Sequence, residues 1–487
     1  MRKYSYLFIS VSCVSLLGAT TAFSSEQTTK ILQDYIGFYQ TGTDKLNVGE
    51  KTDSAKATEW KNITLKSGDG NYQVVIPWMK VAEKLFGGFD LTSAPKTTII
   101  ITRKDMAPVT MVLESSNLLT EVGGSDAART FDTTFDAVTL NTQDNAELGI
   151  TAKINRGTGN RTLFDGENRH STGTFSIADG TVEYSMTKDG LAVTSAYAFQ
   201  DLNGTFDAPS FVSFAGFDVQ NPKTFPDTAR NIKFTYSVAS GNSSTRMVSP
   251  KGGTDIDATF GVSTATMGLV DGVAALNAES ADVSYTVKTS TMGMVPLGFT
   301  ADYVVSNLSV PLDNMDVAKP ANLKLALSGF NLSDPVWAMF DPTGALPRDD
   351  AELDIDITGQ LRWLAKLKDL GRRADNETPP AQFEDVKINA LNLKVAGAEL
   401  QTSGAVTLDN AQFPPMAEGS VNISLLGADG LLQKLLTMGL VPPQYGVMVQ
   451  AMKSMVFKPA AGGGDHLVSL IEFTKNGHIS ANGMALK

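Results

Sequence analysis

The sequence predicts a mainly β protein, built from long curved antiparallel sheet structure with a few short helices. Alternating apolar and polar residues recur along most of the chain, with turn-forming residues between the alternating segments. Apolar residues make up 42% and charged residues 19% of the 487 residues, which is typical of a globular protein. No long apolar run follows the first 24 residues, so we do not expect a bundle of membrane helices.

The first 24 residues have the composition of a secretory signal peptide. Arg2 and Lys3 precede an apolar stretch at residues 7–17, and small residues follow as far as Ser24. The apolar stretch is too short to cross a bilayer as a helix. We therefore expect a periplasmic protein, cleaved near Ser24, with no retained transmembrane helix.

The single cysteine, Cys13, lies inside this expected signal peptide. Ser10 stands three positions before it and the apolar core continues to Leu17, a pattern that disfavours a lipoprotein site. After cleavage no thiol would remain for a disulfide, a thiolate metal site or a cysteine nucleophile. The net charge of −12 disfavours nucleic-acid binding, which requires a basic surface.

The first expected element after the signal is a helix at residues 28–39. Its apolar residues Ile31, Leu32, Tyr35 and Ile36, together with Tyr39, fall on one helical face.

The clearest strand pattern follows at residues 174–199. Alternating segments there end at Asp179-Gly180 and again at Asp189-Gly190, and Asp-Gly is a favoured two-residue hairpin turn. We expect a meander of three strands with one apolar face.

Helices are expected at two further places. Ser333, Asp334 and Pro335 form a helix start signal before Trp337. Near the C-terminus, residues 428–456 predict a helical hairpin: Asp429 is the expected cap of its first helix, which Gly439 ends.

Residues 386–487 follow a recognisable order. A strand pattern at 386–395 precedes the segment 399–409, the strand 421–425, the helical hairpin and a final strand that turns at Asn476-Gly477. This order resembles the bacterial family catalogued as domain of unknown function 2125, found in exported alphaproteobacterial proteins, and residues 1–7 are similar too. It is also similar to the tail of the AsmA-like envelope proteins.

The resemblance implies a long curved β structure, in some members with an apolar groove suited to lipid. It carries over no catalytic residue, because its motifs are architectural. Typical AsmA proteins retain an N-terminal membrane helix that is not expected here, which argues against a bilayer-bridging role. The expected organisation is a signal peptide at 1–24, a β-rich region with one leading helix at 25–240, and an AsmA-like β-rich region at 241–487. Residues 240–254, rich in small and polar residues, are one of several expected linkers, and the boundary between the two β-rich regions is expected near Ser240.

No pattern of residues predicts catalysis or metal binding, and no cofactor is expected. None of His170, His466 and His478 lies within five residues of another, so they form no local zinc motif. Ser93 and Lys96 fit the S-x-x-K motif of penicillin-binding enzymes, but β-forming residues follow instead of a helix.

Carboxylates cluster at residues 349–356. They would suit a calcium site or an acid–base pair. The plainer interpretation is the solvated face of a strand whose other face carries Leu353, Ile355 and Ile357. The carboxylates are Asp349, Asp350, Glu352, Asp354 and Asp356.

The helical hairpin is the only candidate ligand site. The residues that would line or gate an apolar cavity are Leu431, Leu435, Met448, Met452 and Met455. The alternative is that these side chains only cover the end of a sheet, as core.

Three functions stay open at this point. The first is a non-enzymatic envelope protein that binds lipid or another apolar ligand in a β groove. The second is an outer-membrane β-barrel, which the alternation permits although the chain ends in Lys487 and not in an aromatic residue. The third is a periplasmic hydrolase, which would need a nucleophile or metal that the sequence does not display.

Overall fold

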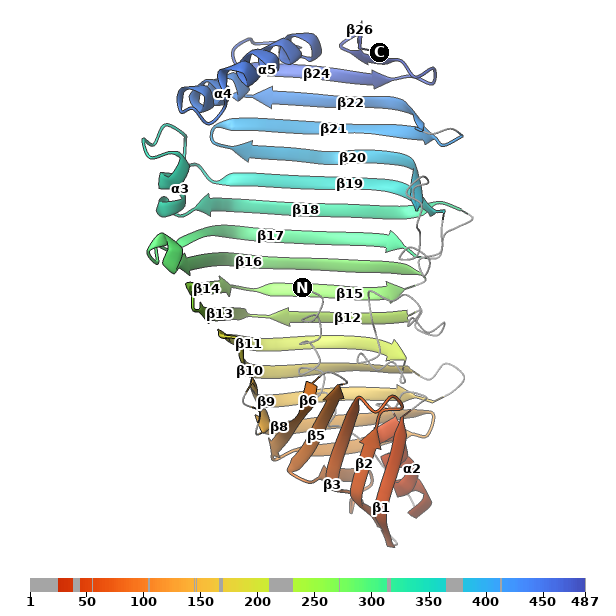
Figure 1. The fold of residues 1–487 in the computed structure, drawn as a ribbon. Coiled ribbons are helices and arrows are strands. Elements are labelled where there is room, and N and C mark those ends of the chain that lie inside the picture. Colours follow the sequence, from red (N-terminus) through yellow and green to blue (C-terminus); the bar gives the residue numbers. More distant parts are fainter. Residues whose placement is uncertain are drawn as a thin grey trace. The chain divides into compact units, whose positions relative to one another are not determined.

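The computed structural model describes residues 25–486, except 38–43, 55, 104–105, 144, 146, 166–169, 210–230, 271, 313–316, 365–379 and 412–413. The expected fold class is confirmed: the structure is 69% strand, the pairing is antiparallel, and the described residues form 26 strands and four short helices, two of them near the C-terminus (Figure 1). The expected signal peptide, with Cys13 and the cleavage point at Ser24, lies outside the described residues.

The chain divides into two compact units, residues 1–257 and 258–487. The linker expected at 240–254 is wrong, because these residues form strand β13 and the start of β14. β14 (Gly252–Phe260) runs through the division. The other elements of the first unit are α2 (Ser25–Gly37), β1 (Lys45–Ser54), β2 (Ala57–Lys66), β3 (Tyr72–Glu83), β4 (Phe89–Ser93), β5 (Lys96–Arg103), β6 (Met106–Ser116), β7 (Leu119–Ser125), β8 (Ala128–Gln143), β9 (Leu148–Phe164), β10 (His170–Lys188), β11 (Leu191–Pro209), β12 (Asn231–Val238) and β13 (Ser240–Ser249).

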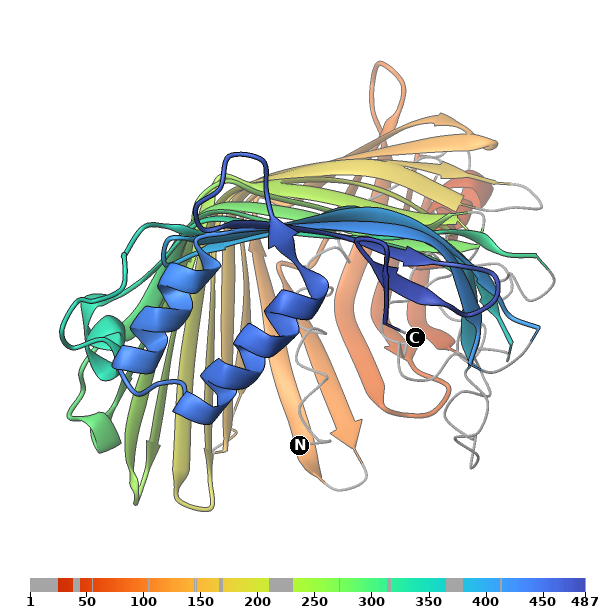
Figure 2. The same cartoon turned by 90° about the horizontal axis from the view of Figure 1, so that it is seen from above.

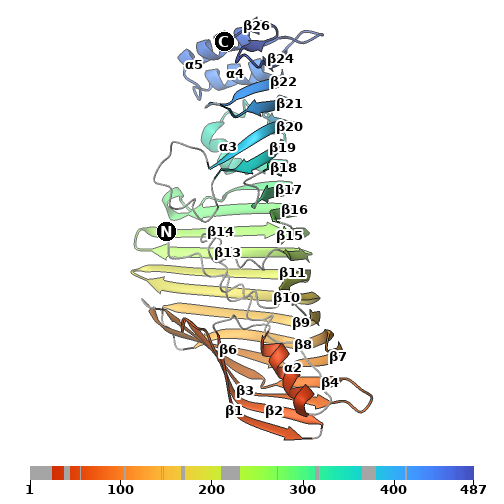
Figure 3. The same cartoon turned by 90° about the vertical axis from the view of Figure 1, so that its right-hand side faces the viewer.

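The helix α2 begins three residues before the expected start, and its apolar face is the expected one. Ile31, Leu32, Tyr35 and Ile36 are all buried. They lie against β2 and β3 (Figure 3), where they join a core that includes Trp60. Burying side chains of this size contributes roughly 1.5–3 kcal/mol each, which anchors the helix. Tyr39 lies outside the described residues.

The sheet of the first unit forks around this core. The first half of β3 pairs with β5 and its second half with β4. In the same way, the first half of β8 pairs with β7 and its second half pairs with β6. A second buried cluster includes residues of β5, β6 and β8, among them Met111 and Leu140.

A crease of left-handed residues crosses β9, β10 and β11. Arg156 on β9 (φ 49°) and Asp201 on β11 (φ 52°) both lie opposite Ala178 of β10 in the strand register. At Arg156 the inward positions of β9 change from even numbers (152 and 154) to odd numbers (157, 161 and 163). Because side chains alternate along a strand, the buried side of β9 therefore changes at Arg156 while the strand itself continues.

This crease explains a wrong prediction. The expected hairpin turn at Asp179-Gly180 lies within one continuous strand, β10, where the inward face changes phase. The second expected turn, at Asp189-Gly190, is confirmed: both residues have positive φ, and Lys188 pairs with Leu191.

Phenylalanine rings on the long strands of this unit lie over glycines of the neighbouring strand. A Cβ added at Gly157 would overlap the ring of Phe135, and one at Gly180 would overlap Phe199. The missing side chain lets each ring lie against the neighbouring backbone, which compensates for the weak strand propensity of glycine.

The second unit is a strand meander in which consecutive strands pair from β15 through β22, and β22 then pairs with β24. A second crease lies here, with Asp282 and Gly329 in the left-handed region opposite Asp302. The elements are β15 (Ser263–Val270), β16 (Val273–Thr289), the 3₁₀ turn η4 (Ser290–Met292), β17 (Leu297–Pro311), β18 (Lys319–Leu332), α3 (Asp334–Phe340), β19 (Ala351–Trp363), β20 (Ala381–Val395), β21 (Ala398–Asp409), β22 (Met416–Leu426), α4 (Ala428–Thr437), α5 (Pro443–Val456), β23 (Lys458–Pro459), β24 (His466–Phe473), β25 (Ile479–Ala481) and β26 (Met484–Ala485).

The free edge of β24 is covered in two pieces. The short strand β23 pairs with its first half, and β25 pairs with its second half. Short edge strands of this kind hinder edge-to-edge association.

We predict that Gly157→Ala lowers the free energy of unfolding of the first unit by about 1–3 kcal/mol, because the new methyl group must displace the Phe135 ring. Urea denaturation measures the change. Gly159→Ala on the same strand is the matched control, since its nearest atom, the Thr174 carbonyl oxygen, would be 3.6 Å from the new Cβ. Equal stability of the two variants would contradict the ring placement.

Candidate functional site: the apolar face of the second unit

Cross-strand pairing in the second unit brings aliphatic side chains from several strands onto one face of the sheet. Leu325 pairs with Ile355, and Ile355 pairs with Leu391. Beside these pairs, Leu393 pairs with Leu400, and Leu400 pairs with Leu425. The register therefore assembles a surface, here called the apolar face, from Leu323, Leu325, Leu327, Leu353, Ile355, Ile357, Ile388, Leu391, Leu393, Leu400, Val406, Val421, Ile423, Leu425, Leu467 and Ile471.

The opposite face of the same strands is polar. Glu352, Asp354 and Asp356 alternate with the apolar residues of β19, as the plainer interpretation of the acidic cluster predicts. Two of them have strand neighbours as partners: Glu352 accepts a hydrogen bond from Lys394 at 2.7 Å, and Asp356 accepts one from Asn389 at 2.8 Å. The sheet is thus amphipathic, with the carboxylates directed away from the apolar face.

The side chains of the apolar face are only partly buried. Leu467 is the one member that falls among the buried residues, whereas Leu393 is 39% exposed. In a two-layer protein such a face would be covered by a second sheet or by helices. In the described part of this unit, the helices reach the face at its margin.

A compact helical cluster forms that margin. Trp337, Leu346 and Ala396 are buried, and Leu332, Phe340, Leu431, Leu435 and Met438 pack against them. Leu332 belongs to the same side of β18 as Leu327, because the bulge between Leu327 and Phe330 preserves the face. Figure 2 shows α4 and α5 under the arch of these strands, so the apolar face lines the concave side of this unit.

The structure separates the five residues of the predicted apolar site. Leu431 and Leu435 pack in the cluster with Trp337, as residues that cover a sheet end would. Met448, Met452 and Met455 lie on α5 and are exposed. Whether any of the five contacts a ligand stays a prediction.

The two helices are joined by a polar contact. Lys453 of α5 donates to both carboxylate oxygens of Asp429 at 2.6 Å, and Gln450 donates to the same group at 3.3 Å. The Lys453 ammonium holds the pKa of Asp429 below its ordinary value. The expected capping role of Asp429 is wrong: Gly427 is the N-cap residue, and the carboxylate of Asp465 accepts from the backbone N–H groups of Asp429 (3.0 Å) and Gly430 (2.8 Å).

The loop after α3 is organised by one buried carboxylate. Asp341 accepts hydrogen bonds from the backbone N–H groups of Leu346 at 2.9 Å and Ala345 at 2.8 Å. Burial alone would raise the pKa of Asp341, but these hydrogen bonds, one from Thr343 and the nearby Arg348 lower it overall. The carboxylate thereby holds Leu346 in the cluster beside Trp337.

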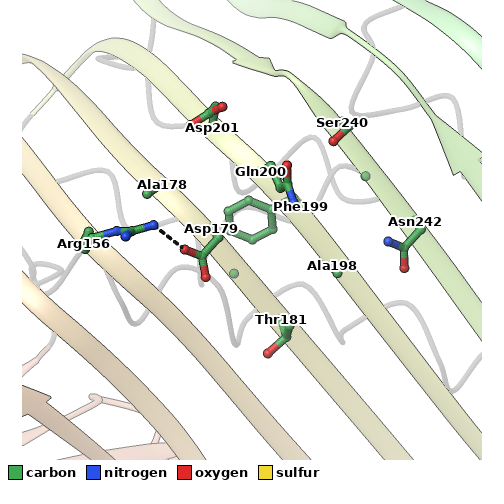
Figure 4. Close-up of a pocket in the computed structure, with 12 residues that line it drawn as sticks. Arg156, Ala178, Asp179, Thr181, Ala198, Phe199, Gln200, Asp201, Ser240 and Asn242 are labelled. Carbon is green, nitrogen blue, oxygen red and sulfur yellow. Dashed lines mark hydrogen bonds and ion pairs between the residues drawn. The ribbon is translucent and has the colours of Figure 1, made fainter.

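A cavity of about 470 Å³ lies in the first unit, at the crease. Arg156 and Asp179 form an ion pair at 3.2 Å on one side of it, and Gln200 and Asn242 line it from neighbouring strands (Figure 4). Asn155 donates to the other oxygen of Asp179 at 2.5 Å. Arg156 and Asp179 are therefore paired with each other, and Asp201 is a third charged residue in the lining.

The histidines have separate structural roles. His170 stacks on Phe164 with 4.6 Å between ring centroids, and His466 shares a hydrogen bond with Ser424 at 2.9 Å. His478 lies in the turn before β25, where its carbonyl accepts from Thr474. Within the described residues, no group of three or more His, Cys, Asp or Glu side chains could hold a metal ion.

The serine motifs do not converge. Ser93 pairs with Met79 of β3, whereas Lys66, which begins a Lys-Ser-Gly sequence that matches a second motif of the same enzymes, pairs with Gln73 of the same strand. Gln73 and Met79 are six residues apart on β3, so the two motifs lie about 20 Å apart along the strand. Lys96 is paired with Glu114 at 3.0 Å.

No family model, curated protein or solved structure matches this chain. Among the residues that the structure describes, no helix has the length and apolarity that crossing a bilayer requires. The resemblance to the exported bacterial family and to AsmA-like proteins stays a prediction.

We predict that Trp337→Ala lowers the free energy of unfolding by about 3–5 kcal/mol, because it opens a cavity between α3, α4 and the sheet margin. Amide hydrogen exchange should become faster in α3 and α4. Met339→Ala in the same helix is the control, since Met339 is exposed and its loss removes little packing. Equal exchange rates in the two variants would show that the Trp337 cluster does not hold the helices.

The contact between α4 and α5 should weaken in acid. The pKa of Asp429 is depressed in the folded chain, so the stabilisation is present above its ordinary value near 3.9 and is lost as the pH falls through the lower folded value. Carboxylate NMR titration measures that pKa. Lys453→Met should raise it, whereas Lys434→Met, which removes the same charge from α4, should leave it nearly unchanged. A pKa that Lys453→Met does not move would contradict the ion pair.

Proposed function

We propose that this protein is an exported, non-enzymatic envelope protein that binds a lipid or another apolar ligand on the apolar face of its second unit. The supporting observation is the one-sided sheet. Aliphatic side chains from β18 to β24 share one face and remain partly exposed to solvent, while the opposite face is polar. A contiguous exposed apolar surface of this kind is typical of an interaction or ligand site.

The dimensions of the face suit an acyl chain. The apolar face runs from β18 through β22 and on to β24, which are six hydrogen-bonded strands, and neighbouring strands are about 4.8 Å apart, so a path across them is about 24 Å long. One lipid tail spans about 15 Å, half the thickness of a bilayer's hydrocarbon core. The face therefore has room for a complete tail lying across the strands.

The energy of such an interaction is sufficient for binding. Each methylene group that leaves water contributes about 0.8 kcal/mol, so even a tail covered on one side gains several kcal/mol. The polar face and the chain's net charge of −12 keep the rest of the sheet hydrated. Export to the periplasm, which the N-terminal sequence predicts, would place the protein among envelope lipids.

The proposal is tested by charging the centre of the face. Ile355→Glu introduces a carboxylate between Leu325 and Leu391, so we predict that affinity for a fluorescent phospholipid falls at least about tenfold, because the charge must lose water when the tail binds. Fluorescence titration measures the affinity, and mass spectrometry of the purified full chain measures co-purified lipid.

Ala405→Glu is the matched control. Ala405 lies on the polar face, is exposed and pairs with Lys387, so the same carboxylate gains a favourable neighbour there. Circular dichroism checks that both variants keep their strand content. Equal lipid affinity in the two folded variants, or no affinity in the parent chain, would refute the proposal.

A further inference from the structure

The helix α5 has the opposite orientation to that of a water-exposed amphipathic helix. Its polar residues Gln450 and Lys453 face the protein, where both contact Asp429 of α4. Gly446 is buried and approaches Leu436 so closely that a Cβ there would lie 2.9 Å from a leucine methyl. The inward side of α5 is thus small or polar.

Most exposed residues of the same helix are apolar, with Gln444 and Ser454 as the exposed polar ones. Val447 is 73% exposed, and Met448, Met452 and Met455 are 50%, 59% and 57% exposed. A helix that borders water presents its charged and polar residues outward and packs its apolar side inward. The reversed arrangement of α5 suits an apolar medium.

The charges around α5 indicate which apolar medium it contacts. Residues 428–459 contain three lysines and one aspartate, in a chain whose net charge is −12. The helix has no acidic residue, and Lys458 lies two residues beyond its end. Tyr445 at its start and Lys458 beyond its end are residue types that anchor helices at the headgroup level of a bilayer.

We infer that α5 is a docking element for a lipid bilayer with anionic headgroups, and that it lies in the plane of the interface. Its 14 residues are about 21 Å long, too short to span the hydrocarbon core of about 30 Å. An interfacial helix buries its apolar side about 5–10 Å into the boundary between headgroups and tails. Flexible methionines adapt to such an irregular surface.

This inference stands apart from the proposed function, because a docking helix needs no lipid on the sheet. If both hold, α5 brings the margin of the apolar face to a membrane that supplies the ligand. Ile355→Glu should leave vesicle binding unchanged, whereas substitutions on α5 should leave the affinity for monomeric fluorescent phospholipid unchanged.

The test is flotation of the full chain with vesicles of phosphatidylglycerol and phosphatidylethanolamine. The triple variant Met448→Gln, Met452→Gln and Met455→Gln should lower the vesicle partition coefficient at least about tenfold, since three side chains that would enter the membrane become polar. The control carries the same change at Met292, Met294 and Met339, which are exposed outside α5. Binding should also fall with added salt and be weaker on pure phosphatidylcholine vesicles.

Two results would overturn the inference. The first is equal flotation of the α5 variant and the methionine control, or no flotation of the parent chain. The second is a parent chain that dimerises in sedimentation experiments, does not bind vesicles and becomes monomeric in the α5 variant. That result would make α5 an interface between two copies of this chain.

Discussion

The second unit depends on one constraint: a sheet with one apolar face leaves that face in contact with water unless something covers it. Cross-strand pairs such as Leu325 with Ile355, and Ile355 with Leu391, shield one another partly, and this mutual contact stabilises the sheet. The shielding is incomplete, since these side chains remain half-buried in the described structure. An apolar ligand would remove the remaining surface from water and, by binding the folded state alone, would stabilise the fold.

The first unit meets the same constraint differently. There α2 covers the sheet, and Ile31, Leu32 and Tyr35 complete a buried core with residues from β2 to β9. A further buried cluster includes residues of β5, β6 and β8. The apolar side chains of this core are buried, unlike those of the apolar face in the second unit, so no ligand is needed to cover them. The contrast places the candidate site in the second unit.

Both units contain residues in the left-handed region within long strands. The strand ladder continues through Arg156 and Asp201 in one unit and through Asp282 and Gly329 in the other. Most of these residues are aspartate or glycine, which tolerate positive φ best; Arg156 is the exception. In the first unit the crease also forms the cavity beside the Arg156–Asp179 pair.

Local patterns in the sequence determined the class of fold, the apolar side of α2, the turn at Asp189-Gly190 and the C-terminal helical hairpin, because each depends on periodicity or turn preference within a few residues. The tertiary structure decided the rest. Asp179-Gly180 carries the same turn signal but is paired on both sides by long strands, and the capping carboxylate of α4 comes from Asp465, 36 residues after Asp429. The apolar face likewise required strand register, which depends on distant segments, and the outward direction of the α5 methionines depended on where Asp429 holds Lys453.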